Sequence, residues 1–174
     1  MAYQKLQALQ ALSVIPSDTV RIPDPSTVVV LDTATGATVG LGDFSVLNTL
    51  TDVGTKFTEA GILPGAIVYG QNRAYYVVSV DSDTQLTLSG GLAAGAADSY
   101  SIYTRATNGC SLFVGTTGDM VVQMASQNGN TTIVSAPANQ EVTFTQIADA
   151  SFLPIQVVRV ARTNTTAKGI IALW

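Results

Sequence analysis

The 174-residue sequence contains no histidine, which removes the side chain that most often serves as a general base or zinc ligand. It has one cysteine, Cys110, so no disulfide can form within the chain and no cysteine cluster can hold a metal. We expect Cys110 to be a small buried hydrophobic residue rather than a reactive thiol. A Ser-His-Asp triad is impossible without histidine, and we expect neither a cofactor nor a metal site.

Charge is also scarce. Charged residues make up 11% of the chain, against roughly 25% in an average globular domain. Lys and Arg number eight and the net charge is −4, so no basic patch for nucleic acid is expected. Apolar residues make up 47%, which predicts a folded chain whose surface is either rich in uncharged polar groups or covered by partners. No run approaches the ~20 apolar residues that cross a bilayer, and the first residues lack the charged region of a signal peptide.

The acidic residues are scattered along the chain, mostly in sequences typical of turns. Residues 81–83 (DSD) lack the further ligands of a calcium loop, and residues 115–119 (GTTGD) lack the lysine of a phosphate-binding loop. We predict turns at both places. Two carboxylates could form a glycosidase pair, but nothing in the sequence brings any two together. We therefore predict that the protein is not an enzyme.

The N-terminal residues show leucines at helical spacing, which predicts a short helix or an arm over residues 3–12. A helix this short is marginal in water and needs a surface to lie on. Three prolines between residues 16 and 25 then exclude a regular helix. We expect residues 1–25 to form an extended arm that contacts a partner outside its own domain. Deleting this arm should weaken partner binding and leave the folded core intact. The candidate partner-contact residues are Leu6, Leu9, Leu12, Ile15 and Trp174.

The middle of the chain has the pattern of short strands and frequent turns that is typical of a small all-β barrel or sandwich. The β-branched run at residues 26–32 predicts a strand. Further strands are expected at residues 66–69, 74–80, 84–89 and 100–103. Leu86 and Leu88 should share one face, as should Tyr100 and Ile102, with Tyr103 on the opposite face.

A second series of strands is expected from residue 108 onward. Residues 110–125 predict a hairpin about a TTGD turn, with Gly118 available for positive φ. We also expect a turn at 126–131, strands at 131–136 and 140–147, a loop at 148–154 and a last strand at 165–174. Residues 155–160 are apolar on both faces, which indicates burial on both sides or a β-bulge near Val157 and Val158.

Three stretches resemble a set of small virion proteins of tailed bacteriophages: residues 11–26, 109–124 and 141–174. The shared features are Pro16-Ser17-Asp18-Thr19, Leu112-Phe113-Val114-Gly115, Gly118-Asp119, Val142-Thr143-Phe144, Leu153-Pro154, Arg159-Val160, Thr163 to Thr166, and Ala172-Leu173-Trp174. Many members of that set resemble a shorter version without the middle. The resemblance implies an arm (1–25), a parent β-sandwich domain (26–37 with 105–174) and a small β-barrel inserted into it (38–104).

The resemblance further implies a non-enzymatic virion protein that decorates or cements the capsid by binding between subunits of the major capsid protein. Such a protein would be a homo-oligomer, for example a trimer, on the capsid exterior after assembly in the host cytoplasm. One alternative is a tail, neck or fibre-base protein. Another is a carbohydrate-binding module, in which Tyr75, Tyr76, Tyr100 and Tyr103 would form an exposed platform. Trp174 should be buried in its own sheet or pack at an oligomer axis.

Overall fold

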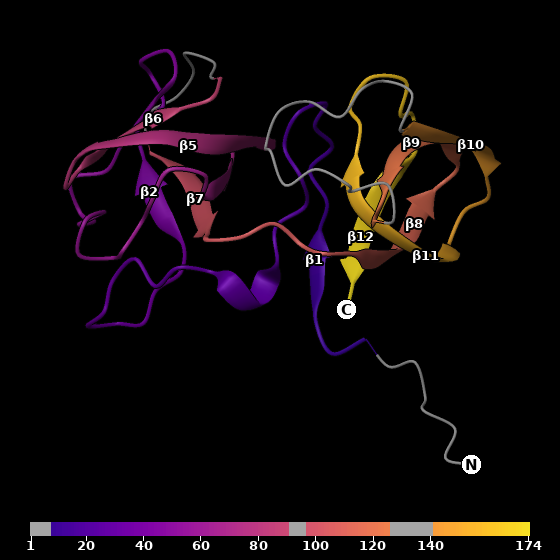
Figure 1. Cartoon of the computed structure of the whole chain (residues 1–174), viewed down its shortest axis with the longest axis horizontal. Coiled ribbons are helices and arrows are strands. Elements are labelled where there is room, and N and C mark those ends of the chain that lie inside the picture. Colours follow the sequence, from indigo (N-terminus) through magenta and orange to yellow (C-terminus); the bar gives the residue numbers. More distant parts are fainter. Residues whose placement is uncertain (1–7, 91–96, 126–140) are drawn as a thin grey trace. The chain divides into compact units, whose positions relative to one another are not determined.

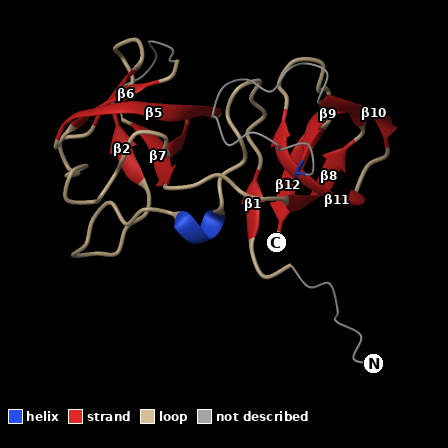
Figure 2. Cartoon of the chain, viewed as in Figure 1, coloured by secondary structure: helices blue, strands red, loops and turns tan. Residues whose placement is uncertain are grey.

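The computed structural model describes residues 8–90, 97–125 and 141–174, and the regular structure in these ranges is almost entirely β-strand. Twelve strands and one short 3-10 helix lie within the described ranges (Figures 1 and 2). The chain forms two compact units, which we call unit 1 (Met1–Thr19 with Thr107–Trp174) and unit 2 (Val20–Ala106). The predicted all-β fold is confirmed.

Unit 1 is built on a six-stranded antiparallel sheet with the spatial order β1-β12-β8-β11-β9-β10. Its strands are β1 (Ala11–Ser13), β8 (Cys110–Thr116), β9 (Gly118–Met124), β10 (Glu141–Ile147), β11 (Ser151–Val160) and β12 (Lys168–Leu173). Its fully buried side chains include Leu112, Val114, Met120, Val122, Val157 and Ala172. Because β12 lies between β1 and β8, the closing strand of the sequence is an inner strand of this sheet.

Strands β8 and β9 follow one another in sequence but are not neighbours in the sheet, so the hairpin predicted over residues 110–125 is wrong. Strand β11 lies between them, pairing with β8 in its first half and with β9 in its second. Its register shifts between Leu153 and Val157 and again between Val157 and Arg159. A ten-residue strand with two such irregularities can bend from one partner to the other. Because β11 pairs with both β8 and β9, these two strands do not pair with each other across the turn that joins them.

The double-sided apolar pattern of residues 155–160 is explained by this bend. Val157, Val158 and Val160 are all buried, and a register shift lies beside Val157, so both predicted features are present. The loop predicted over residues 148–154 is wrong in its second half, because β11 already begins at Ser151. Pro154 is tolerated there since it falls in the interrupted part of the ladder, where its missing N–H breaks no regular pairing.

Unit 2 is a small antiparallel barrel with the strand order β2-β7-β4-β5-β6-β3. Its strands are β2 (Gly40–Gly42), β3 (Thr49–Thr51), β4 (Ile67–Gly70), β5 (Arg73–Ser82), β6 (Gln85–Leu88) and β7 (Asp98–Tyr103). The two terminal strands of this order are joined through Asp43 and Thr51, whose backbones exchange hydrogen bonds of 2.7 and 3.0 Å. The ring of strands is therefore nearly closed, which leaves few unpaired strand edges in unit 2.

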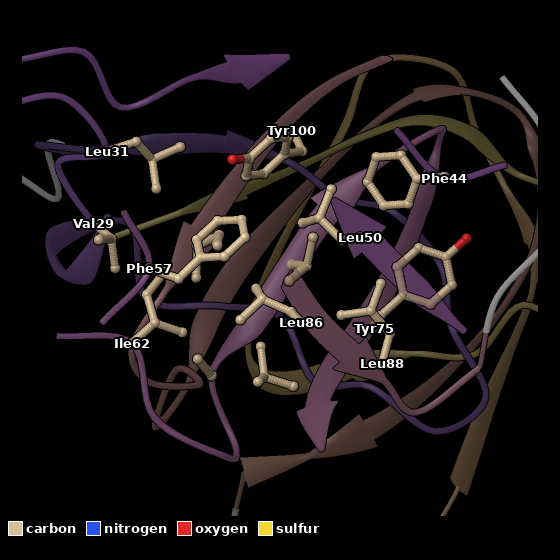
Figure 3. Close-up of a cluster of buried hydrophobic side chains, with 14 residues drawn as sticks. Val29, Leu31, Phe44, Leu50, Phe57, Ile62, Tyr75, Leu86, Leu88 and Tyr100 are labelled. Atoms are coloured by element: carbon tan, nitrogen blue, oxygen red, sulfur yellow. The ribbon is translucent and has the colours of Figure 1, made fainter. Parts of the chain in front are cut away.

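The interior of the barrel is filled by aromatic and branched side chains, shown in Figure 3. The cluster comprises Val29, Leu31, Phe44, Leu50, Phe57, Ile62, Ala66, Val68, Tyr75, Val77, Leu86, Leu88, Tyr100 and Ile102. The ring of Tyr100 meets the rings of Phe44 and Phe57 edge-on, at centroid distances of 6.3 and 6.4 Å. The predicted faces of β6 and β7 are confirmed, because Leu86, Leu88, Tyr100 and Ile102 all point into this core.

Residues 26–37 belong to unit 2 and not, as predicted, to the parent domain. Val29 and Leu31 lie in the barrel core, and Val29 N donates a hydrogen bond to Ile102 O. These residues do not form the predicted continuous strand either. Pro25–Thr27 is a 3-10 helix capped by Asp24, and Val28 and Asp32 make only isolated bridges, to Tyr103 and Ala37. The β-branched run thus supplies core side chains without a regular ladder.

The described N-terminal residues are extended. Ala11–Ser13 is strand β1, and residues 8–10 contain no helical turn, so the predicted helix over residues 3–12 is wrong over its described part. Pairing with β12 satisfies the backbone here, which an isolated short helix could do only marginally. Leu6, the predicted turn at 126–131 and the predicted strand at 131–136 lie outside the described residues.

Candidate interaction surface

The N-terminal segment lies along β12 and is held there by backbone hydrogen bonds. Ala11, Leu12 and Ser13 pair with Leu173, Ala172 and Ile171. Beyond the strand, Val14 N donates to Ile170 O at 2.9 Å and Leu9 N donates to Trp174 O at 2.6 Å. These contacts place residues 9–14 of the predicted arm along the sheet of unit 1, whereas residues 20–25 belong to unit 2, so the arm predicted over residues 1–25 is not one segment.

The candidate contact residues of this segment differ in how much they expose. Leu9 is 90% exposed, Leu12 and Ile15 are half-buried, and their neighbour Val14 is buried. The prediction that deleting residues 1–25 leaves the core intact is wrong, because this deletion removes the buried side chains of Val14, Val20 and Ile22. A deletion that reaches Val14 therefore opens a core.

Trp174 is half-buried and anchored within unit 1. Its indole Nε1 donates a hydrogen bond of 2.9 Å to Oγ1 of the buried Thr107, and its backbone N donates to Gln10 O. The same Thr107 oxygen accepts from Gly109 N at 3.0 Å. The tryptophan therefore connects the last strand to the residues that enter β8.

Asp18 fastens the N-terminal segment to the turn that follows β11. Its carboxylate accepts hydrogen bonds from Arg162 N, Thr163 N and Thr163 Oγ1, each at 2.8 Å. Partial burial raises the pKa of this carboxyl, but the hydrogen bonds from Thr163 and Arg162 and the charge of Arg159 outweigh it, so its pKa lies below the ordinary value. The residue is thus held in its charged form at neutral pH.

Arg159 is the buried cation beside this anchor. It is 3% exposed, and its Nη2 lies 2.6 Å from Oε1 of Glu141 on β10. Its Nη1 donates to the backbone oxygen of Asp18, and its Nε donates to Oε1 of the buried Gln123 at 3.4 Å. One guanidinium therefore joins the N-terminal segment to β9, β10 and β11.

This network of Asp18, Arg159, Glu141 and Gln123 was not predicted as a unit. The sequence marked Pro16–Thr19 and Arg159-Val160 only as motifs, because 141 residues separate Asp18 from Arg159. A rare charge inside an apolar strand was the one available signal, since buried charges are usually paired.

Unit 2 exposes several large aliphatic side chains on its own surface. Leu41 on β2 and the loop residues Val46, Leu47, Val53 and Leu63 are each between 61% and 89% exposed. A shallow depression of about 290 Å³ also lies on this unit, lined in part by Leu31, Asp32 and the ion pair Lys56–Glu59. Asp32 already accepts hydrogen bonds from Ala34 N and Thr35 Oγ1, so its carboxylate is engaged by its own turn.

The four tyrosines predicted as a sugar-binding platform do not form one. Tyr75 and Tyr100 are buried in the barrel core, Tyr103 is buried against Tyr69, and only Tyr76 is partly exposed. The Tyr100 hydroxyl donates a 2.7 Å hydrogen bond to the buried Asp52, and burial raises its pKa well above the ordinary value. These side chains stabilise the barrel and are not available to stack on a ligand.

The remaining residues considered for chemistry have structural partners. Cys110 is buried, its Sγ lies 3.3 Å from Val157 O, and burial raises the pKa of its thiol to about 12. Asp81 lies in strand β5 and not in the turn predicted over residues 81–83, and its carboxylate accepts hydrogen bonds from Ser79 Oγ and Thr87 Oγ1. Within residues 8–90, 97–125 and 141–174, no three His, Cys, Asp or Glu side chains are grouped so that they could hold a metal ion.

Comparisons with protein-family models, with curated proteins and with solved structures give no match to this chain. Among the described residues there is no helix long and apolar enough to span a membrane.

Proposed function

We propose that this chain is a non-enzymatic structural protein of a tailed-phage virion, which decorates the capsid by binding between subunits of the major capsid protein. The observation that carries the proposal is the exposure of large aliphatic side chains on a surface with few charges. Leu9, Leu41, Val46, Leu47, Val53 and Leu63 are each at least 61% exposed, and only 11% of the chain is charged.

Such a surface suits adhesion by many small apolar contacts. Each exposed aliphatic side chain that a partner covers contributes roughly 25 cal/mol per Å² of apolar area, before the cost of ordering is subtracted. One site of this kind binds weakly. Repetition over a lattice of identical subunits raises the effective concentration and makes the attachment durable.

The division of the chain into two compact units supports the same proposal. The stretches that resemble virion proteins lie mainly before residue 20 and after residue 107, and these two parts form one compact unit. Motif residues from different stretches meet there, since Asp18 accepts from Thr163 and Arg159 donates to the Asp18 backbone. The resembling stretches therefore act as one folded module, with unit 2 as a separate barrel.

The test is to find the protein on particles. Mass spectrometry of purified virions should detect it, and cryo-electron microscopy should place it at regular positions on the capsid lattice. Density only at the tail or neck would replace capsid decoration by the alternative virion role. Particles that lack the protein altogether would refute the proposal.

A matched pair of variants connects occupancy to the exposed surface. Val53→Ser and Leu63→Ser remove exposed apolar groups and should lower capsid occupancy with little effect on folding. Thr58→Ala, an exposed residue of the same segment, is the control and should leave occupancy unchanged. Equal occupancy of all three variants would exclude these side chains from the contact.

A further inference from the structure

The two outer strands of the unit 1 sheet differ in how well their edges are protected. Strand β10 carries Glu141 and has an irregular register between Phe144 and Ile147, where Gln146 adopts a positive φ of 52°. Charges and bulges of this kind are the usual means of blocking a sheet edge. Strand β1 has no register irregularity, and no residue from Leu6 to Ser17 carries a charge.

The backbone of β1 presents hydrogen-bonding groups away from β12. Val14 N and Gln10 O bond to β12, so in an antiparallel ladder Leu12 also faces β12 while Ala11 and Ser13 face outward. Both Ala11 and Ser13 are exposed and have small side chains. In the part of the chain that the structure describes, no strand pairs with this outer edge.

We propose that a second copy of this chain binds at the edge of β1, by antiparallel pairing of two β1 strands about a two-fold axis at Leu12. In this register Ala11 of each copy exchanges hydrogen bonds with the partner's Ser13, using the groups that face outward. The two sheets then continue into one another. This dimer would form between isolated chains, and it does not depend on the virion function proposed above.

The side chains fit this register as well as the backbone does. Leu12 lies opposite the partner's Leu12, and the exposed Leu9 comes close to the partner's half-buried Ile15. Apolar cross-strand pairs of this kind stabilise a sheet. No residue from Leu6 to Ser17 carries a charge, so no like charges meet when two copies of this segment pair, and this favours a second copy as the occupant.

Sedimentation of the full-length chain from about 1 µM to about 1 mM covers the range in which a small interface becomes populated. We expect a reversible monomer–dimer equilibrium. Ser13→Lys should weaken dimerisation at least about tenfold, since lysine on an edge strand opposes pairing and the two copies of residue 13 lie close together. Thr145→Lys, an exposed position on the opposite edge strand β10, should leave it unchanged. A wild-type chain that stays monomeric throughout, or an equal effect of the two lysines, overturns the proposal.

A disulfide test reports the register itself. Leu12→Cys places two cysteines at a directly opposed pair, about 4.5 Å apart at Cα, and should form an interchain disulfide on mild oxidation. Gln10→Cys is the control, because two copies of residue 10 would lie about 13 Å apart in this register. The native Cys110 does not interfere, since it is buried. Equal cross-linking of both variants, or none in either, overturns the register, and circular dichroism confirms that each variant is folded.

Discussion

Asp18 should contribute more to the stability of unit 1 than an exposed residue usually does. Its carboxylate accepts three hydrogen bonds from the turn at Arg162 and Thr163. Replacing it by Ala should lower the free energy of unfolding by about 1–2 kcal/mol, the cost of losing a cap of this kind. Urea denaturation at neutral pH measures the loss. Thr163→Val removes only the side-chain hydrogen bond and should cost less than Asp18→Ala.

The same carboxylate makes stability depend on pH. Its pKa is lowered in the folded state, so its contribution is present above the ordinary aspartate pKa and is lost as pH falls through the folded pKa. The difference in unfolding free energy between wild type and Asp18→Asn should therefore be constant near neutrality and shrink below about pH 4. A difference that does not change on acidification would contradict the role assigned to Asp18.

Arg159 is the residue whose loss should cost most in unit 1. Arg159→Met keeps the apolar bulk but leaves the Glu141 carboxylate, the Gln123 oxygen and the Asp18 carbonyl without their donor. We expect a loss of about 2–4 kcal/mol in unfolding free energy. Glu141→Gln keeps a hydrogen-bond acceptor and should cost about 1 kcal/mol. A stable Arg159→Met variant would show that apolar packing compensates fully for the ion pair.

Cys110 should be chemically silent in the native protein. Its thiol is buried and its pKa is raised to about 12, so almost no thiolate is present at neutral pH. A thiol reagent such as DTNB should label it only at the rate of unfolding, and rapidly in denaturant. Fast labelling of the folded chain would show that β8 opens locally.

At the scale of elements, the barrel closes because glycines in β2 let an aromatic ring pass close to the strand. A Cβ atom at Gly40 would lie 2.5 Å from the ring of Tyr100. Gly40→Ala should therefore destabilise unit 2 by about 1–3 kcal/mol, the usual cost of overpacking. Gly90→Ala, whose Cβ would meet no atom within 4 Å, is the control and should change thermal stability little.

Local patterns predicted the strands of the barrel well. Leu86 and Leu88 alternate with polar neighbours, and the residue period alone fixes which face is buried. The predicted hairpin of β8 and β9 was wrong because a turn sequence reports only on its neighbouring residues. Strand β11, which begins 27 residues after the end of β9, lies between the two strands in the sheet. The strand predicted at residues 26–32 failed for a related reason, since Val29 and Leu31 enter a core made by later strands.

The candidate surface was predictable only in part. The sequence indicated Leu9, Leu12, Ile15 and Trp174 as contact residues, and the structure places all four on or beside the β1–β12 pair. It could not indicate that Asp18 meets Arg159, because charge pairs between distant segments leave no periodic signal. The exposure of Val53 and Leu63 was equally hidden, since apolar residues in turns can point inward or outward.

At the scale of the whole molecule, unit 2 has the properties of an independent domain. Its two ends lie together, since Pro23 and Ala106 form a bridge and Asp24 N donates to Arg105 O at 2.9 Å. It also has its own core and a nearly closed ring of strands. Residues 20–106 expressed alone should fold and unfold cooperatively, as measured by circular dichroism and calorimetry. A fragment without a cooperative transition would show that the barrel needs unit 1.

The pairing of β1 with β12 also has a mechanical consequence. Leu9 lies beside Trp174, and the two strands run in opposite directions. Tension applied to these two residues loads their hydrogen bonds one after another, as in opening a zipper, instead of shearing them all at once. The sheet should therefore yield to small forces at this corner.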